Sequence, residues 1–299
     1  MEWVILCGAI LCAALFALAC SNKLCVRKYR VSSDKLTRSF RVAHISDLHE
    51  SCYGKGQEKL IDAVRAAKPD VIFITGDMIE DDKHDSTKIN EFSAENNSRV
   101  ALEALVKIAP CYAVLGNHEA NVPNVNALCD KLREMGVHLL HQCEREAFGG
   151  VLVCGVCDPY FLKGEVHHNN LAERFAEDKA RVSPTLTKWR DMLSDGYGDI
   201  AAEKRFTILL SHRPEEFELY SSLGFDAAFS GHAHGGQWRL PPFIEGVYAP
   251  HQGLFPRHAG GCYKYDGFTH VVSRGLSKKR MVRIFNRPEV CVVDFVKEE

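Results

Sequence analysis

The stretch RVAHISDLH, residues 41–49, joins an apolar run to two side chains of the kind that bind metal ions. Residues 41–46 predict a short strand, and Asp47 and His49 follow where that strand ends. In open α/β sheets, the binding site lies in the loops at the carboxyl ends of the strands. The stretch therefore predicts a buried strand and the beginning of a functional site.

Four further strand ends carry similar side chains. The apolar, β-branched run 71–75 predicts a strand covered on both faces and stops at Gly76 and Asp77. Apolar residues at helical spacing lie between these two strands, and that helix ends before Pro69. Predicted strands at 111–115, 206–210 and 226–229 lead into Asn117-His118, His212 and His232-Ala-His234, respectively. Candidate functional residues thus recur directly after the predicted strands.

The order of predicted elements indicates one α/β domain. A helix is expected at 99–108, and the residues between 80 and 98 are polar enough for a solvated loop or insertion. Polar residues 163–198 predict peripheral helix. Further strands are expected at 137–140, 151–156, 269–273, 281–285 and 290–295. Alternation of strand and helix favours an α/β fold with its site at the strand ends.

Each polar residue alone has an ordinary structural explanation. An Asp after a strand often caps a helix, and Gly-Asn is common in turns. Their combination favours a metal site, because neighbouring strand ends converge in space. Imidazole with carboxylate suits Mn, Fe or Zn better than the all-oxygen sites of calcium. The candidate metal ligands are Asp47, His49, Asp77, Asn117, His212, His232 and His234.

A second metal ion and an acid residue fit the same pattern. Phosphatases clamp the attacking and leaving oxygens between two ions about 3.5–4 Å apart, and a carboxylate such as Asp77 can bridge them. His118 directly follows a candidate ligand, so we expect it to bind the phosphoryl group or protonate the leaving oxygen. Glu80 and Glu119 are candidates for orienting the ligand histidines, with a solvent-facing role as the alternative.

Composition excludes some partners. The formal net charge is −2 and the isoelectric point is near 6.7, and there is no basic stripe to neutralise a nucleic-acid backbone. No GxGxxG follows the first strand, which argues against a dinucleotide-binding protein. The 12 cysteines lack the spacing of a disulfide scaffold. Cys154 and Cys157 are expected to be buried thiols in a reducing compartment.

The first 22 residues predict a membrane anchor. Residues 3–20 contain no charge and as a helix would span roughly 27 Å, close to a bilayer core of about 30 Å. The alternatives are a cleaved signal peptide, a lipoprotein signal and a buried core helix. The basic residues follow the run, which favours an uncleaved single-pass anchor with a cytoplasmic catalytic domain. We expect an anchor at 1–22, a linker at 23–40 and the domain at 41–299.

The blocks Asp47-x-His49, Gly76-Asp77, Gly116-Asn117-His118-Glu119, His212 and Gly231-His232-x-His234 resemble the calcineurin-like metallophosphoesterase superfamily. The resemblance covers residues 41–237 and implies a four-layer αββα sandwich with a binuclear centre. It implies that one metal takes Asp47, His49 and His234, and the other Asn117, His212 and His232. It also implies that Asp77 bridges them, that His118 assists catalysis, and that a metal-bound hydroxide attacks phosphorus.

A narrower resemblance covers the C-terminal third. His212-Arg-Pro, Gly235-Gly236-Gln237 and Arg287-Pro288-Glu289 resemble the membrane-associated bacterial branch typified by YkuE and YaeI. Some members of that branch hydrolyse the pyrophosphate of UDP-2,3-diacylglucosamine. The function expected is hydrolysis of phosphomonoesters or phosphodiesters, with a lipid-linked nucleotide as the alternative substrate. A non-catalytic membrane protein that keeps the metal site for structure or sensing is the alternative of another class.

Six other histidines match none of these blocks and are expected at the surface or in loops. They are His84, His167, His168, His251, His258 and His270. For His251 and His258, the alternative is a position at the border of the substrate pocket.

Overall fold

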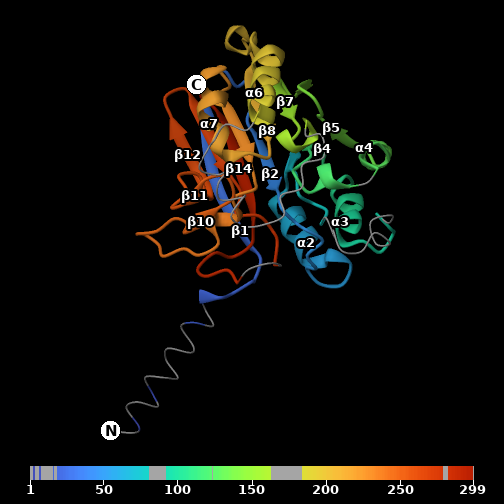
Figure 1. The fold of residues 1–299 in the computed structure, drawn as a ribbon. Helices are drawn as coiled ribbons and strands as arrows, with labels where there is room; N and C mark the ends of the chain where they lie inside the picture. The colour runs from blue at the N-terminus through green and yellow to red at the C-terminus, as the bar shows by residue number, and fades with distance from the viewer. Residues whose placement is uncertain are drawn as a thin grey trace.

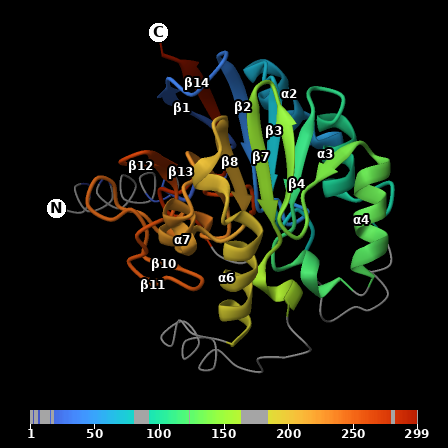
Figure 2. The same ribbon diagram turned by 90° about the horizontal axis from the view of Figure 1, so that it is seen from above.

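The computed structural model describes residues 3, 7, 16, 19–80, 92–122, 124–162, 184–278 and 282–298. Their centre is a pair of six-stranded sheets packed face to face, with helices on both outer faces (Figure 1, Figure 2). The carboxyl ends of the central strands of both sheets point to the same edge.

The first sheet has the strand order β1-β14-β2-β3-β4-β5. Its strands are β1 (Cys25–Ser33), β14 (Glu289–Lys297), β2 (Phe40–Ile45), β3 (Val71–Thr75), β4 (Cys111–Val114) and β5 (Val137–Leu139). All neighbours are parallel except β14 and β2. The buried strands β3 and β4 read as continuous apolar runs, as expected of parallel strands covered on both faces.

The second sheet has the order β12-β13-β9-β8-β7-β6. Its strands are β12 (Gly261–Tyr265), β13 (Phe268–Val272), β9 (Ala227–Ser230), β8 (Phe206–Ser211), β7 (Val151–Val156) and β6 (Glu144–Phe148). Only the two outer pairs are antiparallel. A small two-stranded sheet, β10 (Tyr248–Ala249) and β11 (Gly253–Leu254), follows the last predicted ligand block.

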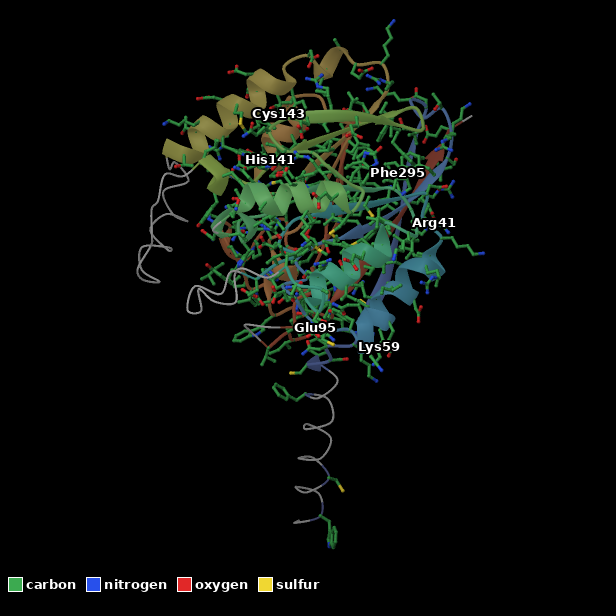
Figure 3. The ribbon with its side chains drawn as sticks, turned by 90° about the vertical axis from the view of Figure 1, so that its right-hand side faces the viewer. Arg41, Lys59, Glu95, His141, Cys143 and Phe295 are labelled. Atoms are coloured by element: carbon green, nitrogen blue, oxygen red, sulfur yellow. The ribbon has the colours of Figure 1, made fainter. Side chains whose placement is uncertain are left out.

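Helices complete two further layers. Against the first sheet pack α2 (Glu58–Ala67), α3 (Asn97–Leu105) and α4 (Val125–Glu134), and against the second pack α6 (Pro184–Tyr197) and α7 (Phe217–Ser222). Short 3-10 turns lie at Lys55–Gln57, Glu119–Asn121, Pro159–Leu162, Ile200–Ala202, Pro214–Glu216 and His234–Gly236. In side view, the helix that carries Lys59 covers the sheet whose strand β14 carries Phe295 (Figure 3).

Three apolar clusters hold the layers together. The central cluster joins the two sheets and is rich in aromatic rings, such as Phe73 against Phe229 at 5.1 Å between ring centroids. The other two clusters lie between each sheet and its helices. The order helix, sheet, sheet, helix is the predicted αββα sandwich.

The segment predicted as a linker, 23–40, is more ordered than expected. Its strand β1 pairs with β14 over nine positions, so these residues belong to the first sheet. The sequence CVRKYRVSS alternates exposed and half-buried side chains, which is the weak signal of an edge strand. The predicted strand 281–285 is also wrong in its described part, where Ile284 makes only an isolated bridge to Trp238.

The predicted anchor, 1–22, falls mostly outside the described residues. Trp3, Cys7, Phe16 and Ala19 have helical backbone. Within the described residues, no helix is long and apolar enough to cross a membrane. The predictions for residues 81–91 and 163–183, including His84, His167 and His168, also lie outside the described residues.

Candidate metal centre

The predicted ligands meet at the edge where both sheets present their carboxyl ends. Asp47 and His49 follow β2, Asp77 follows β3, and His212 follows β8; His232 and His234 follow β9. The first five of these side chains are buried. Two sheets therefore build one centre from residues that are far apart in the sequence.

Five of these residues have a left-handed backbone, which L-residues rarely adopt. The φ angles are 52° at Asp47, 45° at His49, 53° at Asp77, 65° at His232 and 47° at His234. Such conformations cost about 1–3 kcal/mol each and cluster at functional sites. The surrounding packing therefore stabilises turns that aim these side chains into the centre.

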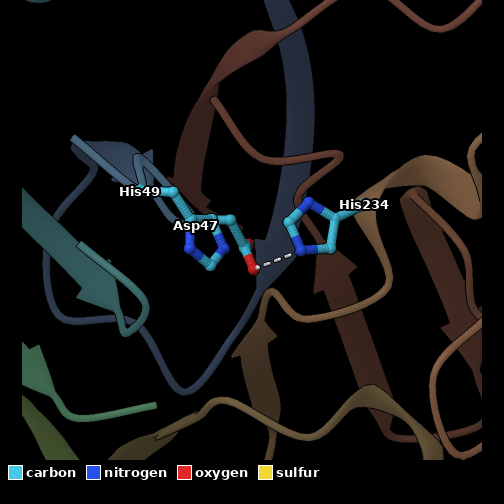
Figure 4. A group of neighbouring side chains, drawn as sticks. All are labelled: Asp47, His49 and His234. Carbon is cyan, nitrogen blue, oxygen red and sulfur yellow. Dashed lines mark ion pairs between the residues drawn. The ribbon is translucent and has the colours of Figure 1, made fainter. Parts of the chain in front are cut away.

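The first group of ligands contains Asp47, His49 and His234 (Figure 4). Nε2 of His234 lies 3.6 Å from Oδ1 of Asp47. The rings of His49 and His234 are nearly parallel, with centroids 5.2 Å apart. The three donor atoms lie within 4.8 Å of one another, so one metal ion fits between them.

The second group contains Asp77, His212 and His232. Nε2 of His212 lies 3.2 Å from Oδ2 of Asp77 and 3.1 Å from Nδ1 of His232. Nδ1 of His212 donates to the carbonyl oxygen of Thr75 at 2.6 Å. Because a carbonyl only accepts, this bond places the proton on Nδ1 and leaves Nε2 free to bind a metal.

Asp77 lies between the two groups. Its Oδ2 atom is 3.6 Å from Nε2 of His49 as well as 3.2 Å from Nε2 of His212. Its Oδ1 atom accepts the backbone N–H of His118 at 2.9 Å. The carboxylate is thus fixed by one oxygen and presents the other to both groups, as a bridging ligand would.

Two buried atoms support a cation in this centre. Among the described residues, neither Oδ1 of Asn117 nor Nε2 of His49 has a hydrogen-bond partner. A buried polar atom without a partner costs about 1–3 kcal/mol, and a coordinated metal ion removes that cost. The donor set of imidazole, carboxylate and amide oxygen suits a transition metal.

His118 is buried beside Asp77 and Glu80. Its Nε2 is 3.9 Å from Oδ2 of Asp77, and its Nδ1 is 3.6 Å from Oε1 of Glu80. The other oxygen of Glu80 is 3.4 Å from Nδ1 of His49. Glu80 therefore contacts both histidines from behind, which agrees with the orienting role predicted for it.

Glu119 does something different from both expectations. Its side chain is buried and accepts backbone N–H groups of Asp77, Met78, Ile79 and Gly116 at 2.7–3.1 Å. It neither faces solvent nor touches a ligand histidine. Glu119 instead ties the loop after β3 to the loop after β4, so that Asp77 and Asn117 keep a fixed spacing.

Two glycines allow these loops to approach each other. A Cβ atom on Gly116 would lie 2.3 Å from Oδ1 of Asp77, and one on Gly231 would lie 2.4 Å from Oδ2 of Asp47. Any larger residue at either position would displace an aspartate of the centre.

Burial and neighbouring charges act differently on the donor groups. Burial raises the pKa of Asp47, and the carboxylates of Asp77 and Asp47 outweigh burial and raise the pKa of His212 to about 10. Burial lowers the pKa of His232 and of His234 well below the ordinary range, so both rings are neutral at pH 7. Burial raises the pKa of Asp77, but the neighbouring His212 ring outweighs it and holds that pKa well below its usual value. A carboxylate and neutral imidazoles are the forms that bind metal.

Arg213 and Asp158 near the centre were not predicted to take part, and for His251 a place beside the pocket was only the alternative expectation. Arg213, on the turn after β8, forms a buried bidentate ion pair with Asp158. Nη1 of Arg213 donates to Nδ1 of His251 at 2.6 Å. The same Nδ1 atom of His251 lies 2.9 Å from Nε2 of His232. His251 thus lies directly behind a ligand. The motif His212-Arg-Pro was the sequence signal for the position of Arg213.

His270 corrects the expectation of a surface or loop position, whereas His251 and His258 lie in loops as expected. His270 lies on β13 with a completely buried side chain, and His258 is buried against Phe217. Of the six histidines predicted at the surface or in loops, the described three are therefore all partly or fully enclosed.

Comparisons with known proteins agree with this geometry. Residues 40–236, well over half of the chain, match the family described as calcineurin-like phosphoesterase. UDP-2,3-diacylglucosamine pyrophosphatase LpxG of Chlamydia muridarum is 26% identical over 85% of this chain and 82% of its own length. YkuE of Bacillus subtilis, an uncharacterized metallophosphoesterase, is 25% identical over 85% and 78%, respectively. Phosphodiesterase YaeI of Escherichia coli is 24% identical over 86% and 82%. The chain belongs to the calcineurin-like phosphoesterase family and is a metal-dependent hydrolase of phosphoester bonds.

Proposed function

We propose that the centre holds two metal ions, chosen from Mn, Fe and Zn, and hydrolyses phosphomonoesters or phosphodiesters. One ion would take Asp47, His49 and His234, and the other Asn117, His212 and His232, with Asp77 between them. The observation that carries the proposal is the position of Oδ2 of Asp77, within 3.6 Å of a histidine from each group.

Bound ions would act as Lewis acids on the phosphoryl oxygens and activate a water molecule for attack on phosphorus. The side chains of this protein would position the ions and balance their positive charge. The two aspartates hold the positive charge in place, and the loops joined by Glu119 fix the distance between the two groups. His118, next to Asp77 and Glu80, donates a proton to the leaving oxygen.

A lipid-linked nucleotide pyrophosphate is the second candidate substrate. The similarity to LpxG over 85% of the chain favours it, because that relative is a UDP-2,3-diacylglucosamine pyrophosphatase. Exposed apolar side chains near the centre, described below, also fit a lipid-bearing substrate.

We further propose that the N-terminal run anchors the protein as a single-pass membrane protein with a cytoplasmic catalytic domain. The support is the uncharged run 3–20 followed by Lys23, Arg27, Lys28 and Arg30. Protease added to sealed, inside-out membrane vesicles should digest the catalytic domain. Protection of the domain in such vesicles would contradict this topology.

The hydrolase proposal is tested by reconstituting the full chain with Mn, Fe or Zn separately. Each form is assayed on a nitrophenyl monoester, the matching diester, cyclic nucleotides and UDP-diacylglucosamine. We expect turnover of at least one of these, in proportion to the metal bound. A chain that binds two ions and hydrolyses none would favour the non-catalytic metal-binding alternative.

A further inference from the structure

An apolar surface begins four residues after the candidate ligand His234. Six large side chains on it are between 43% and 83% exposed: Trp238, Leu240, Phe243, Leu254, Phe255 and Phe285. We call these six residues the apolar rim. Isolated exposed apolar residues are ordinary, but a contiguous group marks an interaction surface.

Backbone contacts make the rim continuous. The indole N–H of Trp238 donates to the carbonyl of Val282 at 2.9 Å, and Trp238 bridges to Ile284, next to Phe285. The N–H of Phe255 donates to the carbonyl of Val247 at 2.9 Å, and Val247 in turn donates to the carbonyl of Trp238. The three chain segments that carry the rim residues are therefore joined to one another.

The rim is coupled to the metal centre through Asn286. The side-chain amide of Asn286 donates to the carbonyl of His234 at 2.7 Å and to that of Gln237 at 3.0 Å. A Cβ on Gly235 would lie 2.1 Å from Oδ1 of Asn286, so the turn and this side chain are in close contact. A contact that fixes the position of the rim therefore also fixes the backbone of His234.

The rim is continuous with the apolar N-terminal run. The N–H of Phe285 donates to the carbonyl of Ala19 at 2.7 Å. Trp3 and Phe16, the described large residues of that run, are themselves exposed. β10 and β11, near the rim, lie on the side from which β1 leads toward the N-terminus (Figure 1, Figure 2). The rim therefore contacts the chain at Ala19, at the end of the uncharged run.

Charge next to the rim favours an anionic lipid surface. Arg287 and Lys23 are exposed, and the guanidinium of Arg287 donates to the carbonyl of Lys23 at 2.9 Å. Between 238 and 256, Glu245 is the single exposed charge, because Arg239 is buried. Aromatic side chains flanked by basic residues bind at the headgroup level of bilayers, where each basic residue contributes about 1 kcal/mol.

We propose that the apolar rim inserts into the headgroup region of an anionic lipid bilayer and holds the metal centre at that surface. This contact is separate from the N-terminal anchor, and it deepens the proposed hydrolase function by presenting the centre to phosphoesters carried by lipids. The acyl part of such a substrate stays in the bilayer while the phosphoester reaches the metals.

Tryptophan fluorescence tests the insertion, because the chain has three tryptophans: Trp3, Trp189 and Trp238. The full-length Trp3→Phe variant keeps buried Trp189 and exposed Trp238. It is reconstituted into vesicles of equal parts phosphatidylcholine and phosphatidylglycerol, with and without a lipid that carries a quencher near the headgroup. We expect the emission of Trp238 to shift to shorter wavelength and to be largely lost with the quencher.

The double variant Trp3→Phe, Trp238→Phe is the matched control, and its Trp189 signal should not respond to the quencher. Phe243→Ser in the Trp3→Phe background should reduce the quenching of Trp238, because Phe243 is the most exposed rim residue. Unquenched Trp238 in a chain that still floats with the vesicles would overturn the proposal. If Trp238 is unquenched and the protein has twice the mass of one chain, the rim contacts a second copy. That result would also overturn the proposal.

Failure of the hydrolase function is read separately. The same samples are assayed on a water-soluble nitrophenyl diester. Quenching without hydrolysis contradicts the proposed function but supports the insertion. Hydrolysis without quenching contradicts the insertion but supports the proposed function.

Discussion

Oδ2 of Asp77 lies 3.2 Å from Nε2 of His212, although the two residues follow strands of different sheets. The centre exists only where both sheets are packed together. A carboxylate in this position has two neighbours of metal-ligand type and one fixed oxygen, which makes Asp77 the first residue to test.

Asp77→Asn should remove bound metal and activity together. The substitution keeps the shape of the side chain but removes the charge that faces both ligand groups. Metal ions contribute several kcal/mol to transition-state stabilisation, so we expect a loss of turnover on the order of 10³-fold. Metal content by elemental analysis and the rate on a nitrophenyl ester measure the two effects. Asp62→Asn on the exposed face of α2 is the control and should change neither. Full metal content in the Asp77 variant would contradict the bridging role.

His118→Asn should lower kcat and leave the metal content nearly unchanged. Loss of a general acid typically costs about 10²–10⁴-fold in rate, and the nearest ring nitrogen of His118, Nε2, lies 3.9 Å from Oδ2 of Asp77. His138→Asn, at an exposed position of β5, is the control. If the His118 variant lost metal as completely as Asp77→Asn, the division of roles would be wrong.

Removal of metal by a chelator should lower the melting temperature as well as abolish activity. A ligand that binds only the folded chain stabilises it by about 2.7 kcal/mol at one hundred times its Kd. The same chelator should not shift the melting temperature of Asp77→Asn. Equal shifts for both proteins would mean that the stabilising metal binds elsewhere.

Glu119→Gln should destabilise the fold more than a surface change of the same kind. Glu119 accepts four backbone N–H groups, and an amide replaces one of its two acceptor oxygens with a donor. Buried donors left without a partner cost about 1–3 kcal/mol. Denaturant unfolding measures the difference, with Glu134→Gln on the exposed end of α4 as the control. Equal unfolding free energies for the two variants would contradict the role of Glu119 in joining the loops.

Acid should destabilise the protein partly through His44. Burial lowers the pKa of His44 from 6.5 to about 3, so the folded ring stays neutral while the unfolded ring takes a proton below pH 6.5. Its contribution to stability is complete above pH 6.5 and is lost as the pH falls toward 3. In the presence of chelator, His44→Leu should flatten the slope of unfolding free energy with pH in this window by about 1.4 kcal/mol per unit. An unchanged slope would mean that His44 is already protonated in the fold.

The candidate ligands can be identified from the sequence because they follow strands with a strong local signal. Runs such as 71–75 and 206–211 are apolar throughout, and the first polar residue after each one marks the edge of the sheet. The division of these residues into two groups came from the family resemblance. The described geometry brings together Asp47, His49 and His234, and also Asp77, His212 and His232, but it groups His118 with His49 and Asp77 as well.

The rest depends on contacts that no local pattern encodes. Strand β1 has only an alternating edge pattern, and its partner β14 lies at the other end of the chain. The position of His251 behind His232 results from a loop that returns from the small sheet of β10 and β11. The hydrogen bonds of Glu119 are donated by backbone N–H groups, which are the same in nearly all residue types and therefore leave no pattern in the sequence.

The pairing of β1 with β14 has a consequence for how the protein is made. On a ribosome, β1 emerges long before β14, the strand that lies between β1 and β2 in the sheet. Domains generally fold as units during synthesis, yet here the first sheet stays open until β14 has been made. A nascent chain stalled before Glu289 would expose the edge of β2 that β14 normally covers. Premature termination within the final strand would therefore leave an aggregation-prone chain, even though every predicted metal ligand had already been made.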